Sequence, residues 1–181
     1  MSWPSDETVM RDVRAGSVQK LAILFDRHHI KLFRFFLRMT GDSHWSEDLV
    51  QEVFVRMLRY RATFREDGGF TAWMYRIARN VHTDQAKPRG WEAPLAEGWD
   101  APSPPEPSPE HDENLALVRK ALIRLPADKR ELLVLARFQG LKYEQIAAIL
   151  ECEVGAVKVR VFRALRSLRE IYFELAGEKA S

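Results

Sequence analysis

Five basic residues near the C-terminus recur at a spacing that places them together on the outside of a helix. They are Lys158, Arg160, Arg163, Arg166 and Arg169, with no acidic residue among them. An apolar series runs between them at steps of four and three: Val157, Val161, Ala164, Leu168, Ile171 and Leu175. This series can dock on the apolar residues of the segment 146–150, which predicts a helix-turn-helix with a basic second helix.

A basic helix in this setting can enter the major groove of DNA. Near its start, Lys158 and Arg160 are expected to reach base edges. Farther along, Arg163, Arg166 and Arg169 are expected to hold phosphates. On this motif alone the alternative stays open that the helix is merely a solvated basic face of an ordinary bundle.

A second group combines aromatic rings, arginines and a Gly68-Gly69 loop. Its members are Phe64, Arg65, Phe70, Trp73, Arg76, Arg79 and Asn80. Rings that stack on unpaired bases, cations for the backbone and a loop that admits an extruded base are what single-stranded nucleic acid requires. For Phe70 and Trp73 the competing interpretation is an ordinary place in the hydrophobic core.

A third group gives one predicted helix an acidic face within an otherwise basic part of the chain. The residues are Asp48, Gln51, Glu52 and Arg56, and the apolar positions between them point elsewhere. The two interpretations are a solvated face and a surface for a basic protein partner. Neither involves contact with DNA, because the carboxylates would repel it.

The elements that position these groups are all predicted to be helices. Apolar residues recur at steps of three and four over residues 21–36, 49–57, 70–81, 115–125, 128–140, 143–150 and 155–175. Gly41 and Asp42 are expected to interrupt the first helix, and Asp128 with Glu131 forms a variant capping box. Because no segment alternates with period two, the sequence predicts an all-α fold.

The charge pattern divides the chain into three parts. The net charge of +2 combines +4 over residues 1–90, −7 over residues 91–114 and +5 over residues 115–181. Seven of the nine prolines lie at residues 88–109, where they oppose regular structure. We therefore expect two small basic domains, at residues 1–90 and 115–181, joined by an acidic linker at residues 91–114.

Several classes of protein are disfavoured by composition. The chain has no run of 18 apolar residues and no basic start followed by an apolar stretch, so the expected location is the cytoplasm, without a membrane partner. Cys152 is the single cysteine, and the five histidines lack partners at metal-site spacing. No metal, no other cofactor and no catalytic group are predicted.

Five motifs in this order resemble the bacterial extracytoplasmic-function (ECF) sigma factors. They are Asp48-Leu49-Val50-Gln51-Glu52-Val53-Phe54; Phe70-Thr71-Ala72-Trp73-Met74-Tyr75-Arg76-Ile77-Ala78-Arg79-Asn80; Leu125-Pro126 with Arg130-Glu131; Gly140-Leu141 with Tyr143, Ile146 and Ala147; and Val154-Gly155-Ala156-Val157-Lys158-Val159-Arg160. The resemblance covers both predicted domains. It implies sigma domains two and four, joined by a linker.

The resemblance also implies partners and roles. The helix from Asp48 to Arg56 would dock on the clamp coiled coil of the RNA polymerase β′ subunit, and the C-terminal domain would contact the β flap. Residues 61–70 would capture an extruded base of the −10 element, and residues 73–80 would meet the melting duplex. The helix-turn-helix from Tyr143 to Arg169 would recognise the −35 element.

The function implied is promoter selection for core RNA polymerase without catalysis, on double- and single-stranded DNA, with an anti-sigma factor as a possible regulator. The alternatives are a sigma-like decoy that sequesters an anti-sigma factor, and a nucleic-acid enzyme. A decoy would be expected to lack the basic helix, and an enzyme needs a metal site or a nucleophile with its base. The pair Asp48 and Glu52 has no third ligand beside it.

Two departures from the family pattern predict local structure. Lys142 and Gln145 replace a usual Ser or Thr cap and its Glu partner, so the helix after them is expected to lose its capping box, worth about 1 kcal/mol. Glu151 stands at the usual turn glycine, which predicts a non-glycine residue at positive φ.

Overall fold

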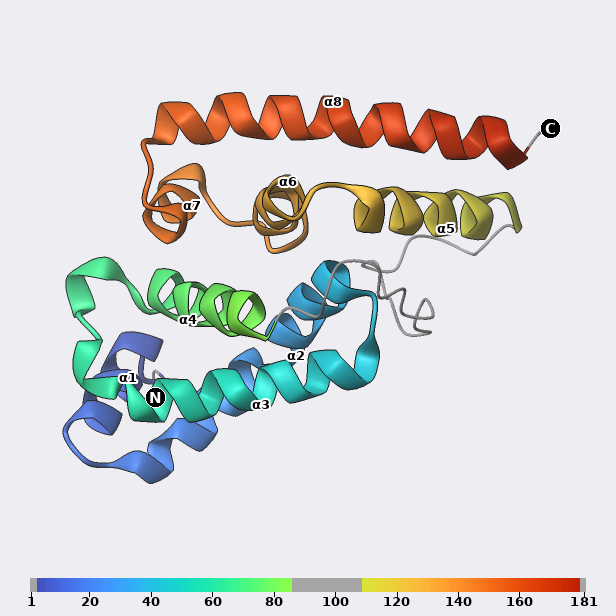
Figure 1. Cartoon of the computed structure of the whole chain (residues 1–181). Helices are drawn as coiled ribbons and strands as arrows, with labels where there is room; N and C mark the ends of the chain where they lie inside the picture. Colours follow the sequence, from blue (N-terminus) through green and yellow to red (C-terminus); the bar gives the residue numbers. More distant parts are fainter. Residues whose placement is uncertain (1–2, 86–108, 180–181) are drawn as a thin grey trace.

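Every regular element in the described part of the chain is helical, which confirms the predicted all-α fold. A computed structural model describes residues 3–85 and 109–179 (Figure 1). The N-terminal unit (residues 3–85) and the C-terminal unit (residues 109–179) are each a small helical bundle. Most of the predicted linker lies outside the described residues.

The N-terminal unit consists of four α-helices and three short 3₁₀ turns. Its elements are α1 (Asp6–Arg14), η1 (Val18–Lys20), α2 (Leu21–Thr40), α3 (Ser43–Arg59), η2 (Arg61–Thr63), η3 (Glu66–Gly68) and α4 (Phe70–Asp84). Helix α2 ends where Gly41 adopts φ 74°, and α3 begins where the Asp42 carboxylate accepts a hydrogen bond from Trp45 N at 2.9 Å. The predicted interruption at Gly41 and Asp42 is confirmed.

Helix α1 was not predicted from the sequence. Its buried side chains are Val9, Met10 and Val13, which join the core of the N-terminal unit. Ser5 caps the helix, because its Oγ accepts a hydrogen bond from Thr8 N at 3.2 Å. At nine residues the helix is too short to be stable alone, so packing against α2 must hold it.

The C-terminal unit contains α5 (Pro109–Arg124), α6 (Ala127–Leu133), the π-helical turn η4 (Val134–Phe138), α7 (Tyr143–Leu150) and α8 (Val154–Lys179). Helix α5 begins inside the predicted linker range, with a proline in its first turn, where the missing N–H costs nothing. In η4, Gln139 N donates to Val134 O at 2.9 Å, an i to i+5 bond that widens the turn.

The variant capping box predicted at Asp128 and Glu131 is wrong. Helix α6 begins at Ala127 after Pro126, and no side chain caps it. Glu131 instead faces the N-terminal unit, where it meets an arginine. A proline before the first turn already fixes the backbone there, so the helix starts without a side-chain acceptor.

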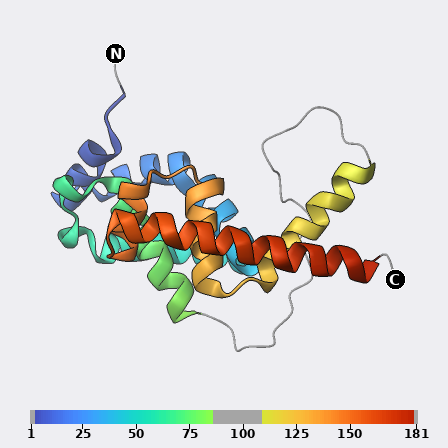
Figure 2. The same cartoon turned by 90° about the horizontal axis from the view of Figure 1, so that it is seen from above.

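The two units pack directly against each other. Helix α7 lies on α4, and α2 contacts α5, α6 and η4 (Figures 1 and 2). The buried residues of both units form one continuous cluster, which includes Trp73 and Tyr75 of α4 and Leu135 and Ile146 of the C-terminal unit. The DNA-binding segments predicted in the two units therefore lie close together.

Candidate nucleic-acid interface

Helix α8 presents all five predicted basic residues to solvent. Lys158, Arg160, Arg163, Arg166 and Arg169 are exposed, as the sequence analysis expected. On the opposite side, Val157, Val161 and Ala164 are buried, in one cluster with Ile146 and Ala147 of α7. Helices α7 and α8 thus form a helix-turn-helix with a cationic outer face.

The turn between these helices depends on Glu151. This residue adopts φ 53° and ψ 48°, the left-handed conformation predicted from its place at the usual turn glycine. This conformation costs a residue that has a Cβ on the order of 1 kcal/mol relative to the right-handed conformation. Glu151 therefore forms the turn into α8 in a conformation that a glycine would adopt without strain.

Two apolar residues on the cationic face escaped the sequence analysis. Phe162 is 70% exposed and Val159 is 49% exposed, beside Arg160 and Arg163. Exposed aromatic and branched side chains can contact the methyl group of thymine in the major groove. The sequence could have indicated this apolar contact, because Phe162 interrupts the series of arginines.

The loop before α4 is held together by aromatic packing. Phe64 and Phe70 are fully buried, Trp73 is 8% exposed, and the Phe64 ring lies edge-on to Trp73 at 5.3 Å between centroids. The Trp73 indole N–H also donates to Thr63 Oγ1 at 3.2 Å. In this conformation the three rings stabilise the loop and offer no open face to a base, whereas Arg65 and Asn80 are exposed.

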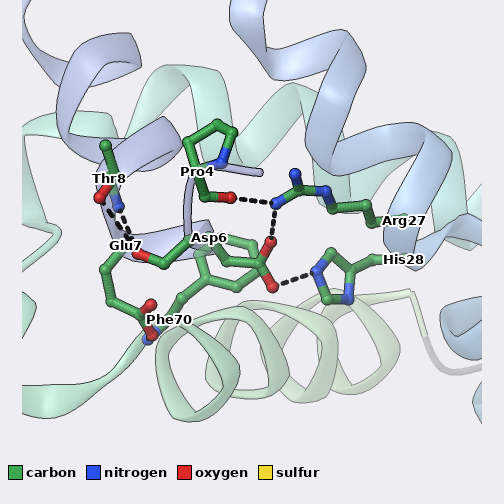
Figure 3. Close-up of polar contacts among 8 residues, drawn as sticks. Pro4, Asp6, Glu7, Thr8, Arg27, His28 and Phe70 are labelled. Carbon is green, nitrogen blue, oxygen red and sulfur yellow. Dashed lines mark hydrogen bonds and ion pairs between the residues drawn. The ribbon is translucent and has the colours of Figure 1, made fainter. Parts of the chain in front are cut away.

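The first turn of α4 is capped by a residue of α1, which lies far away in the sequence. Gly69, the residue before the helix, has no side chain to cap it, and Phe70 N donates instead to Glu7 Oε1 of α1 at 3.1 Å (Figure 3). The carboxylate also lies favourably at the positive end of the helix dipole. A contact across 63 residues is invisible to local sequence patterns.

A polar network ties the same end of α1 to α2. Arg27 donates to Asp6 Oδ1 at 2.7 Å and to the Pro4 carbonyl at 2.9 Å, and a hydrogen bond of 2.7 Å joins His28 to Asp6 (Figure 3). Burial raises the pKa of Asp6, but hydrogen bonds from Arg27 and His28 outweigh it and leave the pKa below its ordinary value. Asp6 is therefore ionised near neutral pH and anchors α1.

The two arginines predicted on α4 are partly exposed, and one is already paired. Arg79 Nε donates to Glu131 Oε2 of α6 at 3.2 Å. Burial raises the pKa of Glu131 and the Arg79 charge opposes that rise. Arg76 lies near the Gly68 backbone, beside the loop. The contact partner of Arg79 comes from the C-terminal unit, which the sequence alone did not indicate.

The acidic face of α3 has an exposed part and a half-buried part. Asp48 and Gln51 are exposed, whereas Glu52 and Arg56 are half-buried and joined by a hydrogen bond of 2.7 Å. Arg56 also pairs with Asp84 at the end of α4. Arg56 therefore fastens α3 to α4, and the sequence had grouped it with the exposed residues.

A groove between α2 and α3 adjoins the acidic face. It has a volume of about 320 Å³, and its lining includes Phe25, Ile30, Phe33 and Gln51. Phe25 and Ile30 are partly exposed there. Exposed apolar side chains that line such a groove can offer a contact surface to another macromolecule.

The capping box predicted to be lost at α7 is half retained. Gln145 Oε1 accepts a hydrogen bond from Lys142 N at 3.0 Å. The Lys142 ammonium cannot accept a hydrogen bond, so the other half of the box is missing. The prediction was wrong for the Gln145 half, because glutamine can replace the usual glutamate as the acceptor.

In residues 3–85 and 109–179, no helix is both long and apolar enough to cross a membrane. Within the same ranges, no three His, Cys, Asp or Glu side chains gather as a metal site would require.

Comparison with known proteins identifies the two units. Residues 24–92 match Sigma-70 region 2 and residues 115–168 match Sigma-70 region 4, which makes the protein an RNA polymerase sigma factor. It belongs to the ECF sigma factors. As a member of this family it binds core RNA polymerase and directs it to promoters through regions 2 and 4, without catalysis of its own.

Relatives of similar length support this assignment. The chain is 31% identical to the RNA polymerase sigma-H factor of Pseudomonas aeruginosa, over 93% of this chain and 94% of the relative. It is 33% identical to ECF sigma factor SigE of Mycolicibacterium smegmatis, over 98% and 73%, and 31% identical to ECF sigma-E factor of Escherichia coli, over 91% and 92%.

Solved structures show the same fold. CnrH, in complex with the cytosolic domain of CnrY, matches 92% of this chain and 96% of that chain with a TM-score of 0.70 at 24% identity. The sigma factor RpoE of Bartonella quintana, in complex with the anti-sigma factor NepR, matches 90% and 91% with a TM-score of 0.59 at 26% identity.

Proposed function

We propose that the outer face of α8 recognises the −35 element. The observation that carries this is the separation of the helix into a buried apolar side and an exposed side with five cations. Lys158 and Arg160 would contact base edges, with Phe162 against a thymine methyl group. Arg163, Arg166 and Arg169 would hold phosphates on either side of the groove.

In the N-terminal unit, we propose that the loop before α4 and the outer face of that helix recognise the −10 element. Arg65 and Asn80 supply an exposed cation and amide, and the partly exposed Arg76 and Arg79 supply two further cations, of which Arg79 is paired with Glu131. Phe64, Phe70 and Trp73 form the frame of the loop, and any base stacking on them requires that the loop rearrange. The proposed division is region 2 in residues 1–90, a linker in 91–114 and region 4 in 115–181.

For polymerase, we propose docking of the β′ clamp coiled coil on the acidic face of α3 and the apolar groove beside it. Asp48 and Gln51 provide exposed polar groups, Phe25 and Ile30 provide apolar contact, and Glu52 is held in place by Arg56. The β flap would be the contact of the C-terminal unit. The protein would act in the cytoplasm, where RNA polymerase transcribes DNA.

An anti-sigma factor is proposed as the regulator of this chain. The supporting observation is that the RpoE relative of known structure is bound to the anti-sigma factor NepR. Genomic neighbours of the gene, tested for binding to the purified chain, would identify such a protein. A decoy role has no specific support, because α8 retains its basic face.

Run-off transcription with core polymerase tests the −35 assignment. Lys158→Glu and Arg160→Glu should each reduce transcription at least tenfold, because a repelling charge replaces a DNA contact worth about 1–3 kcal/mol. Lys120→Glu, an exposed reversal on α5, is the matched control and should leave transcription unchanged. Full promoter selection by both α8 variants would refute the role of this helix.

Association with core polymerase tests the α3 assignment. Asp48→Arg combined with Gln51→Arg reverses the accessible charge and leaves the Glu52–Arg56 pair intact. The double variant should bind polymerase at least tenfold more weakly in a pull-down titration, while Asp26→Arg on α2 should bind normally. Unchanged association of the double variant would contradict docking at this face.

A further inference from the structure

A cavity beside α2 has one wall made of basic residues. It has a volume of about 370 Å³ and lies between α2, the first turns of α4 and residues 138–145. Lys31, Arg34 and Arg38 line it from α2, together with His28. None of the described residues in its lining is acidic. The cavity therefore faces three positive charges that no carboxylate in its walls balances.

The four basic residues lie on one face of α2, because they follow one another at steps of three, three and four positions. The ordinary interpretation of such a series is a solvated face. Here, however, η4 packs on α2, and His28 and Arg38 are only 6% and 4% exposed. This burial distinguishes the face from that of α8, whose five cations are all exposed.

The cations of this face repel one another. Burial and the like charges of Arg34 and Arg119 lower the pKa of Arg38 to about 10. Arg38 Nη1 donates to the Arg34 carbonyl at 3.0 Å, which holds the guanidinium against its own helix. Lys31 and Arg34 are exposed, and neither forms an ion pair within residues 3–85 and 109–179. A bound anion would relieve this repulsion.

His28 has one ring nitrogen that is not satisfied. A hydrogen bond of 2.7 Å joins its Nε2 to Asp6, and its Nδ1 is buried without a hydrogen-bond partner among the described residues. Figure 3 shows this second nitrogen on the side of the ring away from Asp6. A buried polar atom without a partner is unfavourable, and a ligand that bonds to Nδ1 would remove the cost.

The other walls of the cavity are neutral. Met74, Phe138 and Leu141 supply apolar surface, and Thr71 and Gln145 supply a hydroxyl and an amide. Known small-molecule sites have volumes of roughly 300–1,000 Å³, so this cavity is large enough for an organic ligand. A lone phosphate ion would use the cations and leave the apolar walls without a contact.

We propose that this cavity binds a nucleoside diphosphate or triphosphate. The phosphates would lie against Lys31, Arg34 and Arg38, which donate charge-assisted hydrogen bonds to phosphate oxygens. The base and the sugar would lie against the apolar and amide walls, toward His28. This proposal concerns a small-molecule ligand, and it does not depend on the promoter contacts proposed above.

The protonation of His28 fits the sugar or the base better than a phosphate. Burial lowers the pKa of His28, and the hydrogen bond with Asp6 opposes this shift without cancelling it, so the ring is neutral near pH 7. Because the ionised Asp6 accepts from Nε2, the proton is on that nitrogen and Nδ1 is an acceptor. A ribose hydroxyl or a base N–H can donate to it.

Calorimetric titration of the full chain tests the ligand class. The probes are ATP, GTP, CTP and UTP, with pyrophosphate and the four nucleosides as controls. At least one nucleotide should bind once per chain, at least tenfold more tightly than pyrophosphate or its own nucleoside. Absence of nucleotide binding would overturn the proposal, and so would pyrophosphate or a nucleoside that binds as tightly as the nucleotide.

Charge reversals test the position of the phosphates. Lys31→Glu and Arg34→Glu should each weaken nucleotide binding at least tenfold, and both positions are exposed, so the fold should be retained. The matched controls are Lys120→Glu on α5 and Arg163→Glu on α8, which are exposed and outside this cavity. Both should bind nucleotide within twofold of wild type. An equal loss in Arg163→Glu would place the nucleotide on the DNA-binding face and overturn the proposal.

A substitution of His28 tests the nucleoside contact. In His28→Gln the amide can still donate to Asp6, but Nδ1 is lost. The affinity for the nucleotide should fall about fivefold, whereas the affinity for pyrophosphate should stay the same. His29→Gln, on the same helix but outside this cavity, should bind both probes like wild type. Unchanged nucleotide affinity in His28→Gln, or an equal loss for pyrophosphate, would contradict the proposed placement of the nucleoside.

Discussion

The two DNA-binding regions of this sigma factor are built in opposite ways. The C-terminal surface lies along one helix, α8, whose cations are exposed and whose apolar residues are buried. The proposed N-terminal surface combines the outer face of α4 with the loop between η2 and α4; α1 caps this helix through Glu7, and the aromatic residues of the loop are in the core. Residues of a surface that lies on one helix can be substituted one at a time without loss of stability. Substitutions in a surface built from several segments also change the packing that holds those segments together.

The largest difference between the two regions is expected in the stability that is lost when an aromatic residue is replaced by alanine. Phe70→Ala should lower the free energy of unfolding by about 3–5 kcal/mol, because the ring is fully buried. Phe162→Ala should change stability by less than about 0.5 kcal/mol, because the ring is exposed, while weakening transcription from −35-dependent promoters. Urea denaturation of both variants measures the contrast, and equal stabilities would contradict it.

Acid sensitivity linked to a buried histidine should originate at His82, in the N-terminal unit. Burial, reinforced by the charge of Arg130, lowers the pKa of His82 to about 4, and residues 115–181 contain no histidine. The unfolded chain takes up the proton near pH 6.5, so this stability is present above that pH and is lost as the pH falls toward 4. At pH 5 the loss is about 2 kcal/mol at most.

Tryptophan fluorescence can follow this effect, because three of the five tryptophans, Trp3, Trp45 and Trp73, belong to the N-terminal unit and residues 109–181 contain none. The urea midpoint should fall between pH 7 and pH 5, and His82→Gln should reduce the fall. Burial also lowers the pKa of His28, so part of the sensitivity should remain. A variant as acid-sensitive as wild type would exclude His82 as the cause.

The smallest effect is expected in the turn of the helix-turn-helix. Glu151→Gly removes the cost of a side chain at φ 53°, but it also increases the entropy of the unfolded chain. The net result should be a stabilisation of less than about 1 kcal/mol. Thermal unfolding of the variant measures it, and a destabilisation would show that the glutamate side chain contributes contacts that outweigh the strain.

The elements that sequence patterns predicted well are those stabilised by their own residues. The apolar series from Val157 to Leu175 and the interruption at Gly41 are properties of neighbouring residues, and the positive φ at Glu151 followed from its place at the usual turn glycine of the family. Helix α1 was missed because it is short and held by packing. The Glu7 cap and the Arg79–Glu131 pair were missed because each joins residues more than 50 positions apart.

The candidate sites follow the same rule. Exposure of the α8 cations could be predicted from periodicity, whereas the pairing of Arg56 with Asp84 and the burial of Phe64 depend on where whole helices lie. Glu131 is the clearest case. Its spacing from Asp128 favoured a capping role, and tertiary packing turned it toward the other unit instead.

The π-helical turn at Val134–Phe138 implies that a count of residues, as much as their chemistry, sets the contact between the units. Each residue of a helix adds a rotation of about 100°. Deleting one residue from this turn would restore regular α-helix and swing Phe138 and Gln139 away from Arg38 and Tyr75. Relatives that differ by one residue in length here would therefore carry similar side chains but present different ones to the neighbouring helices.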